Sequence, residues 1–280
     1  MNIIIHRGTH QIGGSAIEIS TKSTRIILDF GNELSLDEKY IPINLDIDGV
    51  TKGMLDCDGI VISHYHMDHL GQLTSALPEI PLYMGELSKE VAMISAEYQD
   101  KNLYLRLLGA NTFRGGEAFT IGDIRIRPLV IDHSAADSYM FVIEAEGKHV
   151  LYTGDFRMHG LRHHILDQLV NTYIGEVDVL ITEGTSLSRD ADKYISEAAV
   201  LDDISSYIQD GKYVFIMCSS TNIDRIMGIW QNMPTDKVLI CDAYQKRILD
   251  TVINNVYYES SLYRRHDSPL VLNKGSYPKY

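Results

Sequence analysis

The stretch that decides the fold is His64-Tyr65-His66-Met67-Asp68-His69, which directly follows the apolar run Gly59–Ser63. In an extended loop, residues two apart point the same way, so the first two histidines can reach one ion. The chain then turns toward a helix, which presents the aspartate and the last histidine to a second ion. Neutral imidazole and carboxylate suit zinc or a similar divalent ion. The pattern therefore indicates a two-metal site, and a surface histidine-rich loop is the less favoured alternative.

Potential ligands recur at one further structural position, the C-terminal end of an apolar strand-like run. The side chains that stand there are Asp29, His133, Asp155 and Glu183. Because the ends of neighbouring strands lie along one edge of a β-sandwich, residues far apart in sequence can meet over the same ions. Each residue alone fits a turn or a helix cap equally well. Together with the histidine cluster, they indicate a shared metal site.

The sequence up to residue 190 alternates strand-like and helical patterns in a way typical of a β-rich α/β fold. The expected strands are Gly14–Ser20, Thr24–Phe30, Gly59–Ser63, Phe119–Ile131, Tyr139–Glu146 and His149–Thr153. The expected helices are His69–Leu77, Glu86–Leu108 and Leu161–Tyr173. Residues that tolerate positive φ, at Gly122-Asp123 and Glu146-Gly147, predict hairpin turns.

After Leu187 the pattern changes to one typical of parallel βαβ units. The expected elements are, in order, a helix at Ile195–Gln209, a strand at Tyr213–Met217, a helix at Ile223–Gln231, a strand at Lys237–Cys241 and a helix from Ala243. A polar stretch ending at Asp190 predicts a domain boundary, which divides the chain into residues 1–190 and 191–280. The polar tail from Ser261 is expected to be poorly ordered.

Composition limits the classes of function. The 280 residues are 45% hydrophobic, enough for a substantial core. A net charge of −13 argues against broad electrostatic adhesion to nucleic acid, although a basic channel or bound metal ions can still hold it. Three scattered cysteines, without CxxC spacing, indicate a reducing cytosol. Neither a signal peptide nor an apolar stretch of the ~18 residues that span a bilayer is found, so we expect a soluble, cytoplasmic protein without a membrane partner.

Most of residues 1–245 resemble the metallo-β-lactamase superfamily and, within it, the β-CASP nucleases such as RNase J and the cleavage-factor-like enzymes. The superfamily motifs match Asp29 within Ile27–Gly31, His64–His69 as HxHxDH, Asp132–Ser138 and Tyr152–Arg157. Glu183-Gly184-Thr185 is similar to the acidic motif that opens the β-CASP insertion, and Ser219–Arg225 resembles its first strand-to-helix junction. The resemblance implies an α/β fold: a metallo-β-lactamase αββα sandwich followed by the start of a β-CASP domain.

The resemblance also implies a set of ligands for two divalent ions, zinc or alternatively manganese. It assigns one ion to His64, His66 and His133. Asp68 and His69 belong to the other ion, and Asp155 bridges the two. Asp29 would order the ligand loop through hydrogen bonds to the ligands themselves. Glu183 would support the site or contact the substrate.

One departure from the family concerns the second ion. The family completes that site with a histidine that returns after the β-CASP insertion, and uses another late histidine near the scissile phosphate. In this sequence the only histidine after His164 is His266, which follows no clear strand and resembles neither motif. We therefore expect an N-terminal portion of a longer enzyme, or a shortened variant in which water or a neighbouring subunit fills the gap. Asp68 or a water is then the candidate for proton transfer.

The ligand pattern predicts a metal-dependent hydrolase that uses metal-bound hydroxide. The resemblance, with the α/β extension after residue 190 and Ser219–Arg225, favours a phosphodiesterase or ribonuclease, with Asp68 and Asp155 as catalytic residues. RNA or another nucleic acid is the expected partner, and self-association is left open. Two alternatives remain. The same fold can hydrolyse a thioester, a lactone or a β-lactam. The chain can also be a catalytically incomplete fragment or a non-catalytic subunit, which its metal content would reveal.

Overall fold

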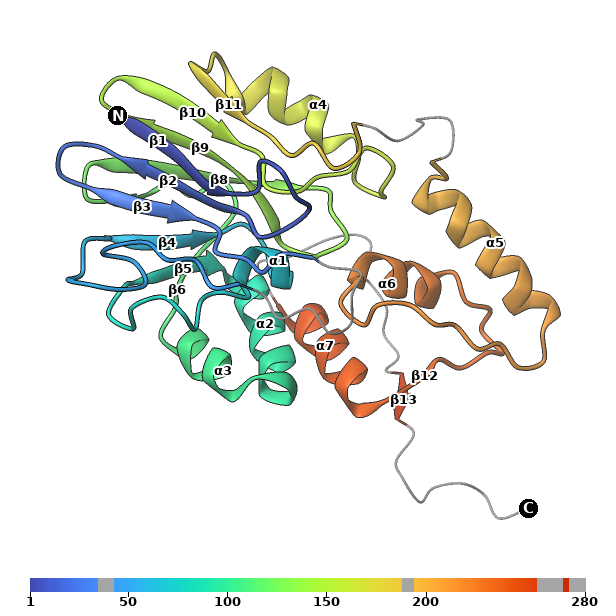
Figure 1. The fold of residues 1–280 in the computed structure, drawn as a ribbon. Helices are drawn as coiled ribbons and strands as arrows, with labels where there is room; N and C mark the ends of the chain where they lie inside the picture. The colour runs from blue at the N-terminus through green and yellow to red at the C-terminus, as the bar shows by residue number, and fades with distance from the viewer. Residues whose placement is uncertain (35–42, 188–193, 256–268, 272–280) are drawn as a thin grey trace.

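The computed structural model describes residues 1–34, 43–187, 194–255 and 269–271. Two β-sheets lie face to face with helices on their outer sides (Figure 1). The first sheet has the order β1 (Asn2–Arg7), β2 (Ala16–Ser20), β3 (Arg25–Leu28), β4 (Gly59–Ile62), β5 (Leu82–Gly85) and β6 (Asn111–Phe113). The second has the order β11 (Val179–Ile181), β10 (Lys148–Tyr152), β9 (Ser138–Ala145), β8 (Ile124–Ile131) and β7 (Phe119–Ile121).

The parallel strands β3 and β4 show why the first sheet is buried on both faces. Successive side chains of a strand point to opposite faces of the sheet. Ile26, Leu28 and Val61 pack between the two sheets. Ile27 and Ile60 point the other way, into the apolar layer beneath the helices. Both faces are therefore covered, which explains why these strands are continuous apolar runs in the sequence.

The helices complete a layered sandwich. The helices α2 (Glu86–Gln99) and α3 (Lys101–Leu108) pack on the outer face of the first sheet. The second sheet is covered by α4 (Ile165–Leu169) and the π-helical turn η1 (Val170–Ile174). The order of layers is helix, sheet, sheet, helix, and it confirms the predicted αββα fold. Among the described helices, none is both long enough and apolar enough to cross a membrane.

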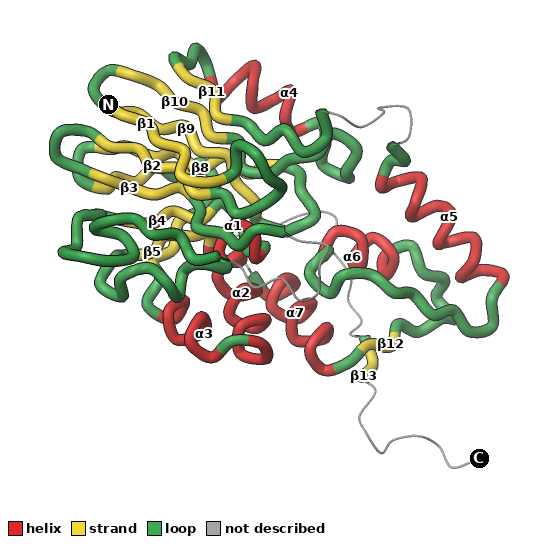
Figure 2. Tube along the Cα trace, viewed as in Figure 1, coloured by secondary structure: helices red, strands yellow, loops and turns green. Residues whose placement is uncertain are grey.

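The part of the chain after residue 193 is mainly helical where it is described (Figure 2). Its helices are α5 (Glu197–Asp210), α6 (Ile223–Gln231) and α7 (Ala243–Asn254). Apolar side chains of α6 and α7 join the same core cluster as those of α2. The predicted boundary at residue 190 lies outside the described residues and stays a prediction. The tail from Ser261 is described only at residues 269–271, so its expected disorder also lies outside them.

One predicted strand in this part is wrong, and another is shorter than expected. Residues 213–217 form no strand, and the side chains of Phe215 and Met217 are 97% and 100% exposed. The strand expected at Lys237–Cys241 is reduced to β12 (Ile240–Cys241), which pairs in parallel with β13 (Leu270–Val271). A strand needs a neighbour that takes its backbone hydrogen bonds. Among the described residues of this part, β12 and β13 are the only pair that provides one.

Two predicted helices have different extents, and two predicted hairpins are confirmed. The helix expected at His69–Leu77 is the single turn α1 (Met67–Leu70), because the Phe30 N–H donates to the His69 carbonyl and the Phe30 carbonyl accepts from the Gln72 N–H. The helix expected at Glu86–Leu108 is divided by Asp100, which is extended and whose carboxylate accepts hydrogen bonds at the start of α3. The strand pairs β7–β8 and β9–β10 are antiparallel across the predicted turns.

Asp137 connects the loop after β8 to the beginning of α2. It is buried in a left-handed conformation with φ 59°. Its carboxylate accepts hydrogen bonds from the backbone N–H of Ser88, at 2.8 Å, and from the Tyr139 hydroxyl. Gly85 permits this approach, since a Cβ there would lie 2.4 Å from Asp137 Oδ2. Burial raises the pKa of the Asp137 carboxyl to about 6.

Asp137→Asn is expected to change how stability depends on pH. Between about pH 4 and pH 6 the native wild type retains a proton on Asp137 that the unfolded chain has released, so this contribution to stability is lost as pH rises. The asparagine has no such proton to lose. Relative to wild type, the variant should gain about 1–3 kcal/mol in free energy of unfolding from pH 4 to pH 7. Urea unfolding at a series of pH values measures this, and a difference that stays constant with pH would contradict it.

Candidate metal centre

The predicted site residues follow strands that end at one edge of the sandwich. Asp29 follows β3, His64 follows β4, His133 follows β8, Asp155 follows β10 and Glu183 follows β11. Strands β3 and β4 are parallel, as are β10 and β11, so the carboxyl ends within each pair lie together. A backbone hydrogen bond of 3.1 Å from Tyr139 N–H to the Ser63 carbonyl joins the two sheets at this edge.

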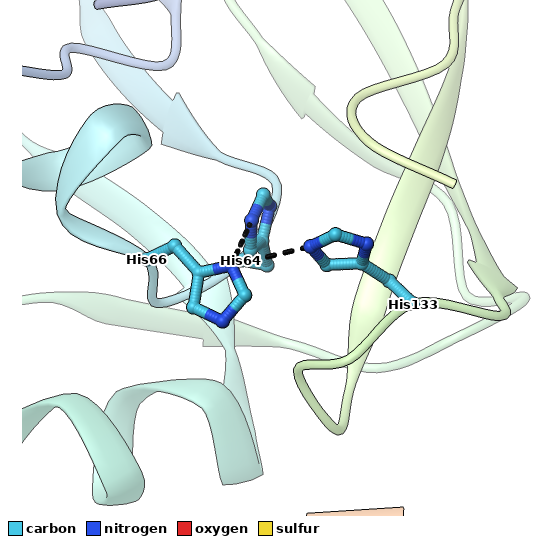
Figure 3. Close-up of side chains that lie close together, drawn as sticks. All are labelled: His64, His66 and His133. Atoms are coloured by element: carbon cyan, nitrogen blue, oxygen red, sulfur yellow. Dashed lines mark hydrogen bonds between the residues drawn. The ribbon is translucent and has the colours of Figure 1, made fainter. Parts of the chain in front are cut away.

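Three imidazoles meet at this edge and form what we call the histidine set: His64, His66 and His133. His64 Nε2 lies 3.1 Å from His66 Nδ1, and His133 Nε2 lies 3.2 Å from the same His66 nitrogen. Figure 3 shows the three rings converging, two from the loop between β4 and α1 and one from the loop after β8. One ligand nitrogen of each lies within 4.8 Å of the others. A single ion can therefore reach all three.

A second set of ligand atoms lies beside the first and contains His64, His69 and Asp155. His69 Nε2 is 3.2 Å from Asp155 Oδ1 and 3.8 Å from Asp68 Oδ2. The other carboxylate oxygen of Asp155 lies 4.0 Å from His133 Nε2, so Asp155 stands between the two sets. Asp68 was expected in the second set but lies next to it, and His64 is common to both. The division of ligands between two ions stays a prediction.

Asp29 lies beneath the ligands and is completely buried. Its carboxylate accepts hydrogen bonds from the backbone N–H and the hydroxyl of Ser63, at 2.7 and 2.8 Å. It also lies 2.8 Å from His69 Nδ1 and accepts a hydrogen bond of 2.5 Å from the Tyr152 hydroxyl. These contacts direct His69 Nε2 toward Asp155. Hydrogen bonds of this kind fix the orientation of a metal ligand, so Asp29 makes the contacts expected of a residue that orders the ligand loop.

The protonation of the histidines is set by burial and by their neighbours. Burial, with the adjacent imidazoles, lowers the pKa of His66 to about 4 and that of His133 to about 3. Burial also lowers the pKa of His64 well below its usual value. These imidazoles are neutral near pH 7, and the neutral form is the one that binds metal. Burial opposes charge on His69 as well, but Asp29 and Asp155 outweigh it and raise the pKa of His69 well above the usual value.

The donor set fits a divalent ion such as zinc. Imidazole nitrogen and carboxylate oxygen are its usual ligands, and the two sets offer both. Asp155 is charged at neutral pH, because His69 and the other imidazoles hold its pKa at about 2 in spite of its burial. The Phe156 backbone N–H donates to Glu183 Oε1 at 3.0 Å, so Glu183 fixes the residue after Asp155.

A cleft of about 1090 Å³ opens over these residues. Asp68, His69, His133 and Asp155 line it from the metal-ligand side. Its other walls include polar and cationic side chains, namely Arg7, His10, Gln11, Arg157, His159, Asn222 and Arg225. The site is therefore accessible to a large polar ligand.

Several residues of the site have no clear signal in the sequence. Tyr152 belongs to the matched motif, but its hydrogen bond to Asp29 spans 123 positions. An ion-pair network at the wall of the cleft joins Asp132, Arg157, Arg162, Glu197, Asp224 and Arg225. Its members come from separate elements, so no local spacing reveals them. His266 lies outside the described residues.

Comparison with known proteins gives a family and several relatives named as ribonucleases. Residues 45–204 match a family described as "Beta-lactamase superfamily domain". The chain is 26% identical to endoribonuclease YSH1 of Gibberella zeae over 281 residues, which cover 92% of this chain and 32% of that protein. It is 27% identical to an RNase J-like protein of Methanocaldococcus jannaschii over 223 residues, or 75% and 49% of the two chains. The chain thus spans between about a third and a half of the length of these relatives.

One solved structure is similar over most of the chain. It is a crystal structure of a protein of unknown function from Enterococcus faecalis V583, with a TM-score of 0.75 and 20% sequence identity. The match covers 88% of this chain and 66% of the other. It supports the fold, and it carries no information on activity.

Proposed function

The chain belongs to the metallo-β-lactamase superfamily, within the branch of the β-CASP nucleases, and from this premise we propose that it is a metal-dependent nuclease that hydrolyses RNA. The observation that carries the proposal is the convergence of the histidine set beside the His69–Asp155 pair, along a large cleft. The relatives that cover most of this chain are named as ribonucleases, which favours RNA among possible substrates.

We assign a first ion to the histidine set, since its three nitrogens are close together and belong to imidazoles that are neutral near pH 7. His64 Nδ1 lies within hydrogen-bond distance of the Ser63 hydroxyl, at 3.0 Å, so we assign Nε2 to the first ion and do not share His64 with a second. The second ion then takes His69 and Asp155, with Asp68 beside them and Asp155 as the bridge. Zinc suits this mixture of ligands, and manganese is the alternative.

The chain's own side chains supply positioning and proton transfer. Bound at these residues, divalent ions would acidify a coordinated water and offset negative charge on the substrate phosphate. Asp68 lies at the cleft with its side chain 14% exposed. Burial raises the pKa of its carboxyl, and the charge of Asp155 adds to this effect against that of His69. A carboxyl of raised pKa within reach of substrate can exchange a proton with the attacking water or the leaving oxygen.

The cleft favours a polyanion over a small apolar substrate. Its volume of about 1090 Å³ is slightly above the roughly 300–1,000 Å³ typical of small-molecule pockets. Arg7, Arg157 and Arg225 line it, each paired with a carboxylate of the chain, and the chain as a whole carries a net charge of −13. Divalent ions held at the two ligand sets would add the positive charge that attracts phosphate to the cleft. This distribution fits the proposal that nucleic acid binds in the cleft and not over the whole surface.

Hydrolysis of end-labelled single-stranded RNA should test the proposal against its alternatives. The purified chain is supplied with zinc or manganese and given RNA, DNA of the same sequence, or a panel of thioesters and lactones. We expect RNA cleavage that depends on metal and stops when a chelator is added. Cleavage confined to the thioesters or lactones would contradict the nuclease proposal. Well under one metal per chain, without stabilisation by added metal, would favour a non-catalytic subunit.

A further inference from the structure

Tyr65 stands between two members of the histidine set, and its ring lies edge-on to that of His66, with the ring centroids 5.6 Å apart. The Tyr65 ring belongs to the main core cluster and is 6% exposed. The hydroxyl at its end accepts a hydrogen bond of 2.8 Å from the Ala136 backbone N–H. It also donates one of 2.8 Å to the Thr221 carbonyl.

This single hydroxyl connects three segments that are distant in sequence. Tyr65 belongs to the loop that carries two members of the histidine set, and Ala136 to the loop that carries the third, His133. Thr221 belongs to what we call the α6 segment, residues 219–231, which comprises the predicted β-CASP junction and α6. The two ligand loops are thus held against the same point of the α6 segment.

The ion-pair network provides a second connection between the same parts. Arg157 Nε donates a hydrogen bond of 2.9 Å to Asp132, the neighbour of His133, and its Nη1 lies 3.5 Å from Glu197. Glu197, at the start of α5, accepts hydrogen bonds of 2.6 and 2.9 Å from Arg225 in the α6 segment. Asp224, also in the α6 segment, accepts one of 2.7 Å from Arg162.

The carboxylates of the network are closed to solvent. The side chains of Asp132, Glu197 and Asp224 are at most 2% exposed, and three arginines balance their charge. Buried ion pairs and hydrogen bonds are stronger than exposed ones, because the surroundings have a low dielectric constant. Removal of one partner therefore lowers the stability of the folded chain substantially. The α6 segment is therefore fixed both to the loop of His133 and to the loop that follows Asp155.

We propose that the α6 segment stabilises the geometry of the metal centre. Tyr65 is the positioning residue, and its hydroxyl fixes the two ligand loops relative to each other. Tyr65 touches neither substrate nor the reacting atoms; it acts through His64, His66 and His133. The inference rests on the proposed function, because it requires that the histidine set binds a metal ion. It adds that the part of the chain beyond residue 194 controls the geometry of that site.

Tyr65→Phe tests this positioning role, because it keeps the ring in the core and removes only the hydroxyl. Titration with cobalt(II), followed by the visible absorption of the bound ion, reports both affinity and ligand geometry. We expect roughly 10–100-fold weaker cobalt binding and an altered absorption spectrum, as for the loss of other residues that orient ligands. Tyr244→Phe is the matched control, since its hydroxyl lies 2.8 Å from Ser95 Oγ on α2, away from the site. It should bind cobalt as the wild type does.

Glu197→Gln provides a second test, which also decides the case if Tyr65→Phe does not fold. It weakens the other connection to the α6 segment without touching a ligand, and we expect weaker cobalt binding here too. Unchanged cobalt affinity and spectrum in a folded Tyr65→Phe chain would overturn the inference, as would unchanged values in Glu197→Gln where the first variant is unfolded. Wild-type protein that binds no cobalt would instead overturn the proposed function.

Discussion

His133→Ala is expected to lower the rate of RNA cleavage about a thousandfold, or ~4 kcal/mol of transition-state stabilisation. His133 supplies the member of the histidine set that comes from the second sheet, and its Nε2 lies 3.2 Å from His66 Nδ1. Without it, the two remaining histidines hold an ion less firmly. The side chain lies at the cleft and not in the apolar core, so the fold should persist. Cleavage of labelled RNA and metal content by elemental analysis measure the two effects.

His149→Ala is the matched control for this loss of an imidazole. His149 lies on β10 with its side chain exposed, and its contact to Asp178 is made by the backbone N–H, which alanine retains. The control should cleave RNA and bind metal as the wild type does. If His133→Ala kept wild-type activity and metal content, the histidine set would not be the metal site.

Asp29→Ala should have the largest effect on stability, about 3–5 kcal/mol in the free energy of unfolding. The carboxylate is completely buried and satisfies donors of Ser63 and Tyr152 as well as His69. Its removal leaves those donors without partners inside the protein. Alanine also adds strain, because residue 29 has φ 56°, in the left-handed region. Urea unfolding of the metal-free protein measures the loss.

Asp29→Asn separates the charge of this residue from its shape. Asparagine tolerates a left-handed conformation and keeps one acceptor oxygen, so it should lose less stability than alanine. It removes the negative charge that faces His69, and metal affinity should fall roughly 10–100-fold. Equal stability of wild type and Asp29→Ala would show that Asp29 does not support the ligand loop.

The sequence could indicate that the candidate ligands lie together because their signals are local. His64, His66, Asp68 and His69 stand within one short stretch, and its fixed spacing relates them without knowledge of the fold. Asp29 and Asp155 each follow an apolar run, so the rule that strand ends converge was enough to place them. The structure brings all of these together. It differs in detail, since His64, and not Asp68, completes the second set of three ligand atoms.

Other features could not be predicted because they depend on contacts between distant segments. Tyr65 and Thr221 are 156 positions apart, and nothing in either segment indicates that they meet. The strand expected at residues 213–217 fails for the related reason that its apolar pattern needs a neighbouring strand. The described residues give it none. Apolar alternation indicates what a segment can form, and its partners determine whether it does so.

The most direct test of the metal centre is anomalous diffraction from crystals of the wild-type chain soaked with zinc. Data collected on either side of the zinc absorption edge locate the ion independently of any assumed ligands. We predict an anomalous peak about 2.0–2.1 Å from the ligand nitrogens of His64, His66 and His133. Zinc bound elsewhere in the crystal, with no peak among these three histidines, would contradict the account.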